Sequence, residues 1–201
     1  MIKLLIFDFD DTLLHLNVDW FSFEKELYSS FNVNSELESK LSSFTLPQKL
    51  NYLSNDSISL KKSLSIQQKY ESMCVKSKNY VLFAPMLDFL ILAKSKGFSI
   101  AIVSANLIST IESILTDLNL ISYVDLVVGR DSCKKTKPDK EPIIFALKKL
   151  NFTDSQSLFI GDSINDSLAS NSANVSFYCI DPQNPKKAKQ ELSKLLSIGQ
   201  M

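Results

Sequence analysis

The segment Ile6–Leu13, with the sequence IFDFDDTL, places three carboxylates at the end of an apolar run. Asp8, Asp10 and Asp11 occupy three of four consecutive positions, so their mutual repulsion has to be offset by a neighbouring group. Carboxylate oxygens, together with water and phosphate oxygens, are the ligands that Mg²⁺ prefers. The sequence therefore predicts Mg²⁺ bound at this acidic cluster.

Other polar side chains follow later apolar runs. They are Ser104 and Asn106, then Lys137, then Asp162 and Asp166. In an open parallel sheet, ligands gather at the carboxyl ends of the strands, so groups that follow different strands can meet at one edge. Several carboxylates, one hydroxyl and one ammonium can hold a divalent cation and a phosphoryl group at a single point. We therefore predict that these residues form one site.

The elements that would carry this site are five apolar runs with helical segments between them. The apolar runs are Lys3–Phe9, Phe98–Ser104, Tyr123–Gly129, Ser157–Asp162 and Val175–Asp181. The helical segments are Pro85–Ala93 with its end at Gly97, Asn106–Asn119, Lys140–Leu150, Ile164–Asn171 and Lys186–Ser197. Continuous apolar character is typical of parallel strands that are covered on both faces. We expect an α/β fold with a Rossmann-like, doubly wound parallel sheet of five or more strands.

Residues 14–81 interrupt this alternation. They contain no strand-like run, and their apolar side chains recur with helical spacing, as at Phe21, Phe23, Leu27 and Phe31. We predict a helical insertion after the first strand, with Trp20, Phe21 and Phe23 in its apolar interior. His15, the only histidine, is interpreted as a polar loop residue.

Composition sets limits on partners and surroundings. The 201 residues include 22 Lys plus Arg and 22 Asp plus Glu, so the chain has no overall charge that would attract nucleic acid or an anionic membrane. Its three cysteines fit neither a disulfide framework nor a metal knuckle. No run reaches the roughly 18 apolar residues of a membrane span. We expect a cytoplasmic protein, a monomer or a homodimer, that binds neither nucleic acid nor membranes.

Four segments occur in the order and approximate spacing of motifs of the haloacid dehalogenase superfamily. They are DFDDT at Asp8–Thr12, IVSAN at Ile102–Asn106, TKPDKEPIIFALKKL at Thr136–Leu150 and LFIGDSINDSLAS at Leu158–Ser170. The chain resembles the phosphatase branch of that superfamily, of the phosphoglycolate phosphatase and β-phosphoglucomutase type. The resemblance implies a Rossmann-like catalytic core in residues 1–15 and 82–201, with a helical cap (residues 16–81) inserted after the first strand.

The resemblance also implies catalytic roles. Asp8 would attack phosphorus in line and form an aspartyl-phosphate. Asp10 would protonate the leaving oxygen and then deprotonate the water that hydrolyses this intermediate. Ser104 would donate a hydrogen bond to a phosphoryl oxygen, and Lys137 would neutralise charge on the nucleophile and the phosphate.

The same resemblance implies a metal site made by Asp8, the backbone carbonyl of Asp10, Asp162 and Asp166. Asp166 would orient either Lys137 or a metal-bound water.

The residues predicted to bind substrate are Thr12, Ser104, Asn106 and Lys137. Two roles stay open for Asn106, which follows the motif serine after Ala105: a phosphate contact, or the N-cap of a helix.

The second aspartate of the first motif, Asp10, favours phosphoryl transfer over dehalogenation, because a halide leaves without a proton. We therefore predict a Mg²⁺-dependent phosphatase, a phosphoric monoester hydrolase that acts on a small phosphorylated metabolite. The alternatives are a sugar phosphomutase of the same superfamily and a catalytically inactive binding protein on the same fold. Phosphoglycolate, a sugar phosphate, a nucleotide monophosphate and pyrophosphate all stay open as substrates.

Overall fold

A computed structural model describes residues 1–198 of the chain. Five parallel strands form the central sheet in the order β5-β4-β1-β6-β7. They are β1 (Leu4–Phe7), β4 (Ser99–Val103), β5 (Leu126–Val128), β6 (Ser157–Gly161) and β7 (Ser176–Cys179). The predicted α/β fold with a parallel sheet is therefore confirmed.

Strand β1 lies in the middle of the sheet and is apolar throughout because both of its faces are covered. Leu5 and Phe7 pack into one hydrophobic cluster, whereas Leu4 and Ile6 pack into another on the opposite face. The strand pairs with β4 on one side and with β6 on the other. Asp8, the next residue, therefore lies at the centre of the carboxyl edge of the sheet.

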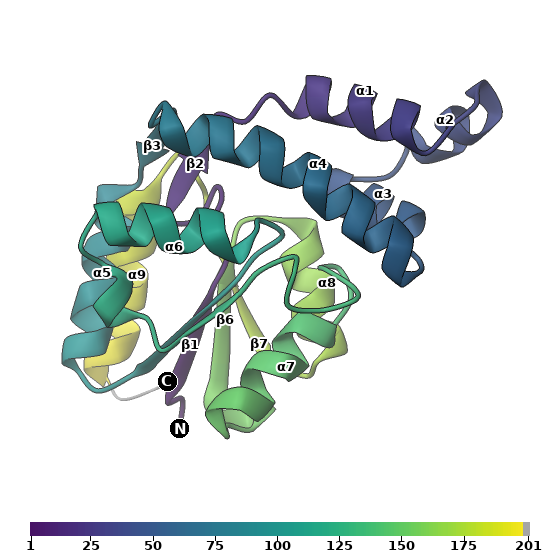
Figure 1. Cartoon of the computed structure of the whole chain (residues 1–201). Coiled ribbons are helices and arrows are strands. Elements are labelled where there is room, and N and C mark those ends of the chain that lie inside the picture. Colours follow the sequence, from purple (N-terminus) through teal and green to yellow (C-terminus); the bar gives the residue numbers. More distant parts are fainter. Residues whose placement is uncertain (199–201) are drawn as a thin grey trace.

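Helices cover both faces of the sheet (Figure 1). The helices α5 (Ala84–Ser95), α6 (Ile108–Asp117) and α9 (Pro185–Ile198) supply apolar side chains to the cluster of β1 that contains Phe7. The helices α7 (Glu141–Leu150) and α8 (Ile164–Ser172) supply them to the cluster that contains Ile6. Two short 3₁₀ turns, η1 (Ile121–Tyr123) and η2 (Asp154–Gln156), precede β5 and β6.

Four helices lie together above the sheet (Figure 1). They are α1 (Trp20–Ser30), α2 (Ser35–Leu41), α3 (Leu46–Leu53) and α4 (Ser57–Lys76), and all of them fall within the cap. They share a hydrophobic cluster of their own that includes Phe23, Leu27 and Leu50. The division of the chain into core and cap stays a prediction.

The expectation that residues 14–81 contain no strand is wrong. Leu14–Leu16 forms β2 and Tyr80–Leu82 forms β3, and the two pair antiparallel with Leu14 opposite Leu82. Three residues are too few for an alternating pattern to stand out in a sequence. His15 lies within β2 rather than in a loop.

The aromatic residues of α1 divide between two environments. Phe23 is fully buried and its ring lies 5.5 Å from that of Trp20 and 5.8 Å from that of Tyr70. Phe21, by contrast, is 78% exposed, so its assignment to the apolar interior is wrong. Positions two residues apart on a helix lie roughly 200° apart around its axis, so the two side chains cannot face the same core.

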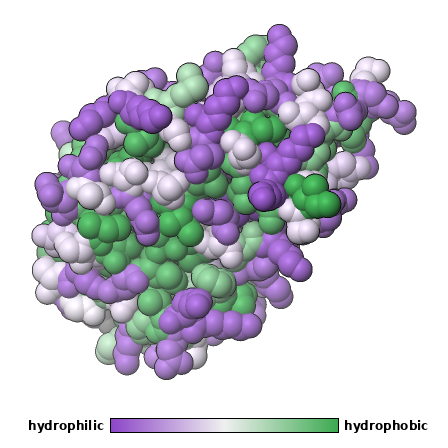
Figure 2. Space-filling model, in the orientation of Figure 1, coloured by the Kyte–Doolittle hydropathy of each residue, from purple (hydrophilic) through white to green (hydrophobic). Residues whose placement is uncertain are grey.

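The surface that faces the viewer in Figure 1 is mixed. Hydrophilic side chains are spread over it, and hydrophobic ones form patches between them (Figure 2). None of the helices in residues 1–198 combines the length and the apolar character needed to cross a membrane.

Candidate active site

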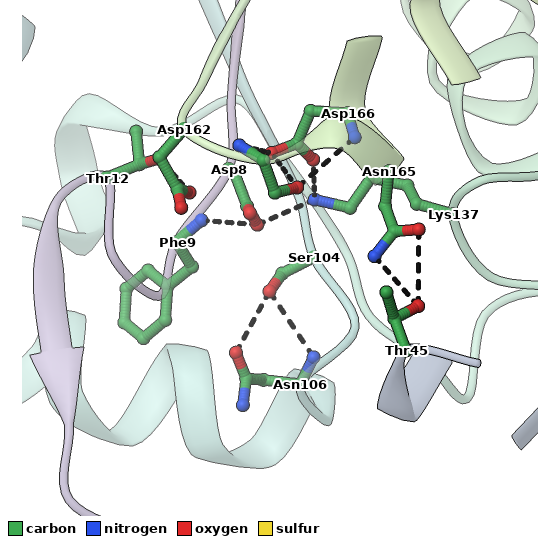
Figure 3. A network of polar contacts seen from close by, with 11 residues as sticks. Asp8, Phe9, Thr12, Thr45, Ser104, Asn106, Lys137, Asp162, Asn165 and Asp166 are labelled. Carbon is green, nitrogen blue, oxygen red and sulfur yellow. Dashed lines mark hydrogen bonds and ion pairs between the residues drawn. The ribbon is translucent and has the colours of Figure 1, made fainter. Parts of the chain in front are cut away.

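The structure brings together groups from four separate motifs at the carboxyl edge of the sheet (Figure 3). Asp8 follows β1, Ser104 follows β4 and Asp162 follows β6, while Lys137 comes from the loop after β5. All four side chains line one cavity of about 390 Å³. The parallel order of the strands positions them, because it places the carboxyl ends of β4, β1 and β6 side by side.

Lys137 lies between two carboxylates. Its Nζ is 2.7 Å from Asp8 Oδ1 and 2.6 Å from Asp166 Oδ1. Burial alone would lower the pKa of Lys137, but the charges of Asp166 and Asp8 outweigh burial and raise it above the usual value. The ammonium therefore stays charged next to Asp8.

Asp166 is fully buried, and both of its oxygens are engaged. Oδ1 contacts Lys137, and Oδ2 accepts hydrogen bonds from Ser163 N (3.0 Å) and Ser163 Oγ (2.6 Å). Burial opposes ionisation, yet Lys137 and Ser163 together lower the pKa of Asp166 below the usual value. Of the two roles open for Asp166, this geometry favours orienting Lys137.

Asp8 is costly to ionise in this environment. Burial raises the pKa of Asp8 well above its usual value, the Asp166 charge adds to the rise, and Lys137 opposes it. The backbone N–H of Phe9 donates to Asp8 Oδ1 at 2.7 Å. A cation beside Asp8 would favour its ionised form.

The acidic groups fit a hard divalent cation. Asp8, Asp162 and Asp166 have carboxylate oxygens within 4.8 Å of one another, although those of Asp166 already contact Lys137 and Ser163. Burial raises the pKa of Asp162 to about 6, and the charges of Asp166 and Asp11 add to this effect. The donor set consists entirely of oxygen, as Mg²⁺ requires, and a bound cation would favour the ionised forms of Asp8 and Asp162, whose pKa values burial raises.

Thr12 lies next to the same cluster of carboxylates. It is fully buried, and its hydroxyl donates to Asp162 Oδ1 at 3.2 Å. It does not belong to the residues that line the cavity. In this structure its hydroxyl is directed to Asp162, and its role as a substrate contact stays a prediction.

Asp10 is a half-buried carboxyl group with a raised pKa. Burial raises the pKa of Asp10 to about 7, although a hydrogen bond from the backbone N–H of Leu16 opposes the rise. That bond, 2.7 Å long, also fixes the carboxylate against β2. A pKa near neutrality lets one group both give and take a proton. His15 contacts the neighbouring acid, with Nδ1 2.6 Å from Asp11 Oδ1.

Ser104 is oriented by Asn106. The Ser104 hydroxyl donates to Asn106 Oδ1 at 3.0 Å and accepts from Asn106 N at 3.3 Å (Figure 3). Helix α6 begins at Ile108 with Leu107 as its N-cap, so the capping role considered for Asn106 is wrong. Both Ser104 and Asn106 line the cavity.

Glu71 of α4 was not predicted to belong to this site. It is fully buried, and its carboxylate accepts from Gln67 Nε2 (2.8 Å), Asn106 Nδ2 (3.0 Å) and Leu107 N (3.0 Å). A cap carboxylate thus holds Asn106, which in turn holds Ser104. Nothing in the sequence marks this position, because a single glutamate in a polar helix is ordinarily interpreted as solvent-exposed.

The cavity lies between the core and α1, α3 and α4. The lining residues that these helices contribute are Trp20, Phe21, Glu24, Leu46, Pro47, Leu50 and Gln67. Further polar contacts hold the helices in place: Asn51 bonds to the backbone of Thr136, and Thr45 bonds to Asn165. Hydrogen bonds therefore join the cap wall of the site to the core in this structure.

Comparisons with known proteins agree with this geometry. The sequence profile of the haloacid dehalogenase-like hydrolases matches residues 5–180. A phosphoglycolate phosphatase of Colwellia psychrerythraea is 34% identical over 105 residues, which is 52% of this chain and 45% of the relative. The chain thus spans less than half the length of this curated relative.

Two solved structures share the fold. A predicted phosphatase from Clostridium acetobutylicum superposes with a TM-score of 0.70 at 17% identity, covering 97% of this chain and 100% of its own. A HAD-superfamily hydrolase from Ehrlichia chaffeensis gives a TM-score of 0.60 at 23% identity, with coverage of 98% and 99%. The chain belongs to the haloacid dehalogenase-like hydrolase family.

Proposed function

We propose that this chain is a Mg²⁺-dependent phosphatase that hydrolyses a small phosphorylated metabolite through an aspartyl-phosphate. The observation that carries the proposal is the position of Lys137, which lies within 2.7 Å of Asp8 and borders the same cavity as Asp10 and Ser104. A nucleophile, an acid, a cation and a hydroxyl donor therefore border one space. The relatives named phosphoglycolate phosphatase support the same activity.

In the first half of the reaction, an oxygen of Asp8 attacks phosphorus and the bond from phosphorus to the ester oxygen breaks. Asp10 donates its proton to that departing oxygen, so the alcohol leaves neutral. Lys137 and Ser104 interact with the phosphoryl oxygens. Mg²⁺, held by Asp8, the Asp10 carbonyl and Asp162, would supply positive charge that offsets the repulsion between carboxylate and phosphate.

In the second half, Asp10 is ionised and takes a proton from a water molecule. That water attacks the phosphoryl group, the bond from phosphorus to Asp8 breaks, and inorganic phosphate is released. Asp10 is protonated again at the end of the cycle. A pKa of about 7 for Asp10 suits both halves.

The test is hydrolysis of p-nitrophenyl phosphate by the full chain, with Mg²⁺ and with EDTA. Asp8→Asn should lower kcat by at least about 10³-fold at unchanged circular dichroism. Asp88→Asn is the matched control, because Asp88 is a surface aspartate of α5 that pairs with Lys189. Undiminished turnover in Asp8→Asn would refute the proposed nucleophile, and absence of any turnover in the unmodified chain would support the inactive binding protein.

The cytoplasmic location and the monomeric or homodimeric state stay predictions. The phosphomutase alternative needs a second assay with a sugar phosphate and its bisphosphate, because a mutase requires a sugar bisphosphate and releases little inorganic phosphate.

A further inference from the structure

The cap wall of the cavity is mostly apolar, although Glu24 and Gln67 also line it. Among the residues described, α1 and α3 contribute five apolar side chains to it: Trp20, Phe21, Leu46, Pro47 and Leu50. Phe21 is 78% exposed although it is a large aromatic residue. Ligand pockets are lined mainly by apolar and aromatic side chains, and Phe21 is one of the side chains that line this cavity.

The charged groups that line the cavity are predominantly negative. Its lining carboxylates are Asp8, Asp10, Asp11, Glu24 and Asp162. Lys137 is the one cation among the described lining residues, and it is already paired with Asp8 and Asp166. No lining cation is therefore left to receive a second anionic group on a substrate.

The nearby basic side chains are engaged elsewhere. Lys49 of α3 lies 2.6 Å from Glu24 Oε1, and its Nζ is 5.8 Å from the centre of the Tyr28 ring. Arg130, the only arginine of the sequence, is buried, and its Nη1 donates to the carbonyls of Cys133 and Lys134. Bidentate recognition of a carboxylate by arginine is therefore not available at this site.

We infer that the preferred substrate is a phosphate monoester whose leaving group is uncharged and largely apolar, such as an aryl group. This inference rests on the proposed function. The leaving group would pack against Trp20, Phe21 and Leu46, and a volume of about 390 Å³ accommodates a phosphoryl group with one ring. A leaving group with its own carboxylate would meet an apolar wall and Glu24, whose charge is already paired with Lys49, so its burial there without a free cation is unfavourable.

The first experiment compares phenyl phosphate with 2-phosphoglycolate on the full chain with Mg²⁺, using release of inorganic phosphate as the common measurement. We expect kcat/KM for phenyl phosphate to be at least about tenfold higher, because burying a ring against an apolar wall stabilises the complex. An equal or higher value for 2-phosphoglycolate would overturn the inference while leaving the phosphatase proposal intact. Failure to hydrolyse either compound would overturn the inference, whereas the phosphatase proposal would then be decided by phosphate release from a sugar phosphate and a nucleotide monophosphate.

The second experiment alters the wall. Phe21→Arg should raise kcat/KM for 2-phosphoglycolate and lower it for phenyl phosphate, so that the ratio of the two shifts by about tenfold or more. Phe21 is largely exposed, so the substitution leaves the interior of the cap unchanged.

The matched control is Ile58→Arg. Ile58 is 81% exposed and is the second residue of α4, as Phe21 is the second residue of α1, but it lies outside the cavity lining. Its variant should keep the ratio of the unmodified chain. A ratio that moves equally in both variants, or in neither, would overturn the assignment of the apolar wall to the leaving group.

Discussion

Asn51 and Thr136 are joined by two hydrogen bonds, one in each direction. Asn51 Nδ2 donates to the Thr136 carbonyl at 2.8 Å, and the Thr136 N–H donates to Asn51 Oδ1, also at 2.8 Å. Asn51 belongs to α3, whereas Thr136 immediately precedes Lys137. A cap side chain therefore fixes the backbone that carries the ammonium of the site.

Asn51→Ala removes both bonds and leaves the N–H of Thr136 without its partner. We expect the free energy of unfolding to fall by about 1–3 kcal/mol, and kcat/KM for an aryl phosphate to fall about tenfold as Lys137 is positioned less well. Steady-state kinetics and urea titration measure the two effects. Asn34→Ala is the control, because Asn34 caps α2 within the cap and accepts from Leu37 N. If both variants retain full kcat/KM, the link from Asn51 to Lys137 has no catalytic role.

Lys137→Met leaves Asp8 and Asp166 facing each other without the charge that separates them. We expect hydrolysis to fall by about 10²-fold or more, and the free energy of unfolding to fall by about 3–5 kcal/mol at pH 8. The loss of stability should be smaller at pH 5, because the two carboxylates can then bind a proton in the folded state. Urea titration at the two pH values measures this.

The double variant of Lys137→Met with Asp166→Asn separates stability from catalysis. It should recover much of the stability at pH 8, since one of the repelling charges is gone, and it should stay inactive. A single variant as stable as the unmodified chain at pH 8 would contradict the role assigned to the ion pairs.

The metal-free protein should become less stable as the pH rises from about 4 to 7. The pKa of Asp10 is raised to about 7 and that of Asp162 to about 6, both chiefly by burial, from an ordinary value of 3.8. The folded state then binds more protons than the unfolded state in this interval, so each added pH unit favours unfolding. Melting temperatures in EDTA from pH 5 to pH 8 measure the trend, and Asp10→Asn should flatten it.

Addition of Mg²⁺ should raise the melting temperature more at pH 8 than at pH 5, because protons compete with the cation for the same oxygens. Na⁺ at equal ionic strength controls for screening. An equal rise at both pH values would show that the carboxylates of the site do not hold the ion.

Glu71 should be coupled energetically to Ser104 although the two do not touch. Glu71→Gln replaces an acceptor of Asn106 and Leu107 by a group that also donates, and we expect about 1–3 kcal/mol of lost stability. Kinetics of Glu71→Gln, Ser104→Ala and the double variant form a cycle. The effects on kcat/KM should be clearly less than additive, because Glu71 acts through the position of Ser104. Full additivity would show that Glu71 has only a structural role.

Much of the fold could be predicted from the sequence because its signals are local. The run Leu4–Phe7 is continuous and apolar, which is typical of a strand covered on both faces, and the same holds for β4 and β6. The polar groups of the site lie directly after these strands, except Lys137, which lies in the loop after β5. Asp8 is contacted by Lys137 rather than by Lys134 or Lys135. The resemblance to the family implies this choice, because Lys137 directly precedes Pro138 in the matched motif.

The remaining features depend on contacts between distant segments. The short strand β2 is stable only because β3, more than sixty residues later, returns beside it. The exposure of Phe21 depends on how α1 is rotated toward the core, and its own sequence spacing does not determine that rotation. Glu71 can be recognised as part of the site only in the folded structure, where α4 lies across the start of α6.

The pairing of β2 with β3 has a consequence for how this protein can diverge. Leu16 and Tyr80 are paired opposite each other, so the chain leaves the core after β2 and returns to it at β3 at two neighbouring points. Residues between those two points can change without separating the strands that hold the reacting carboxylates, provided that Asn51 and Glu71 keep their contacts with the core. A segment that keeps these two contacts can acquire a new substrate preference while Ser104 and Lys137 stay in place.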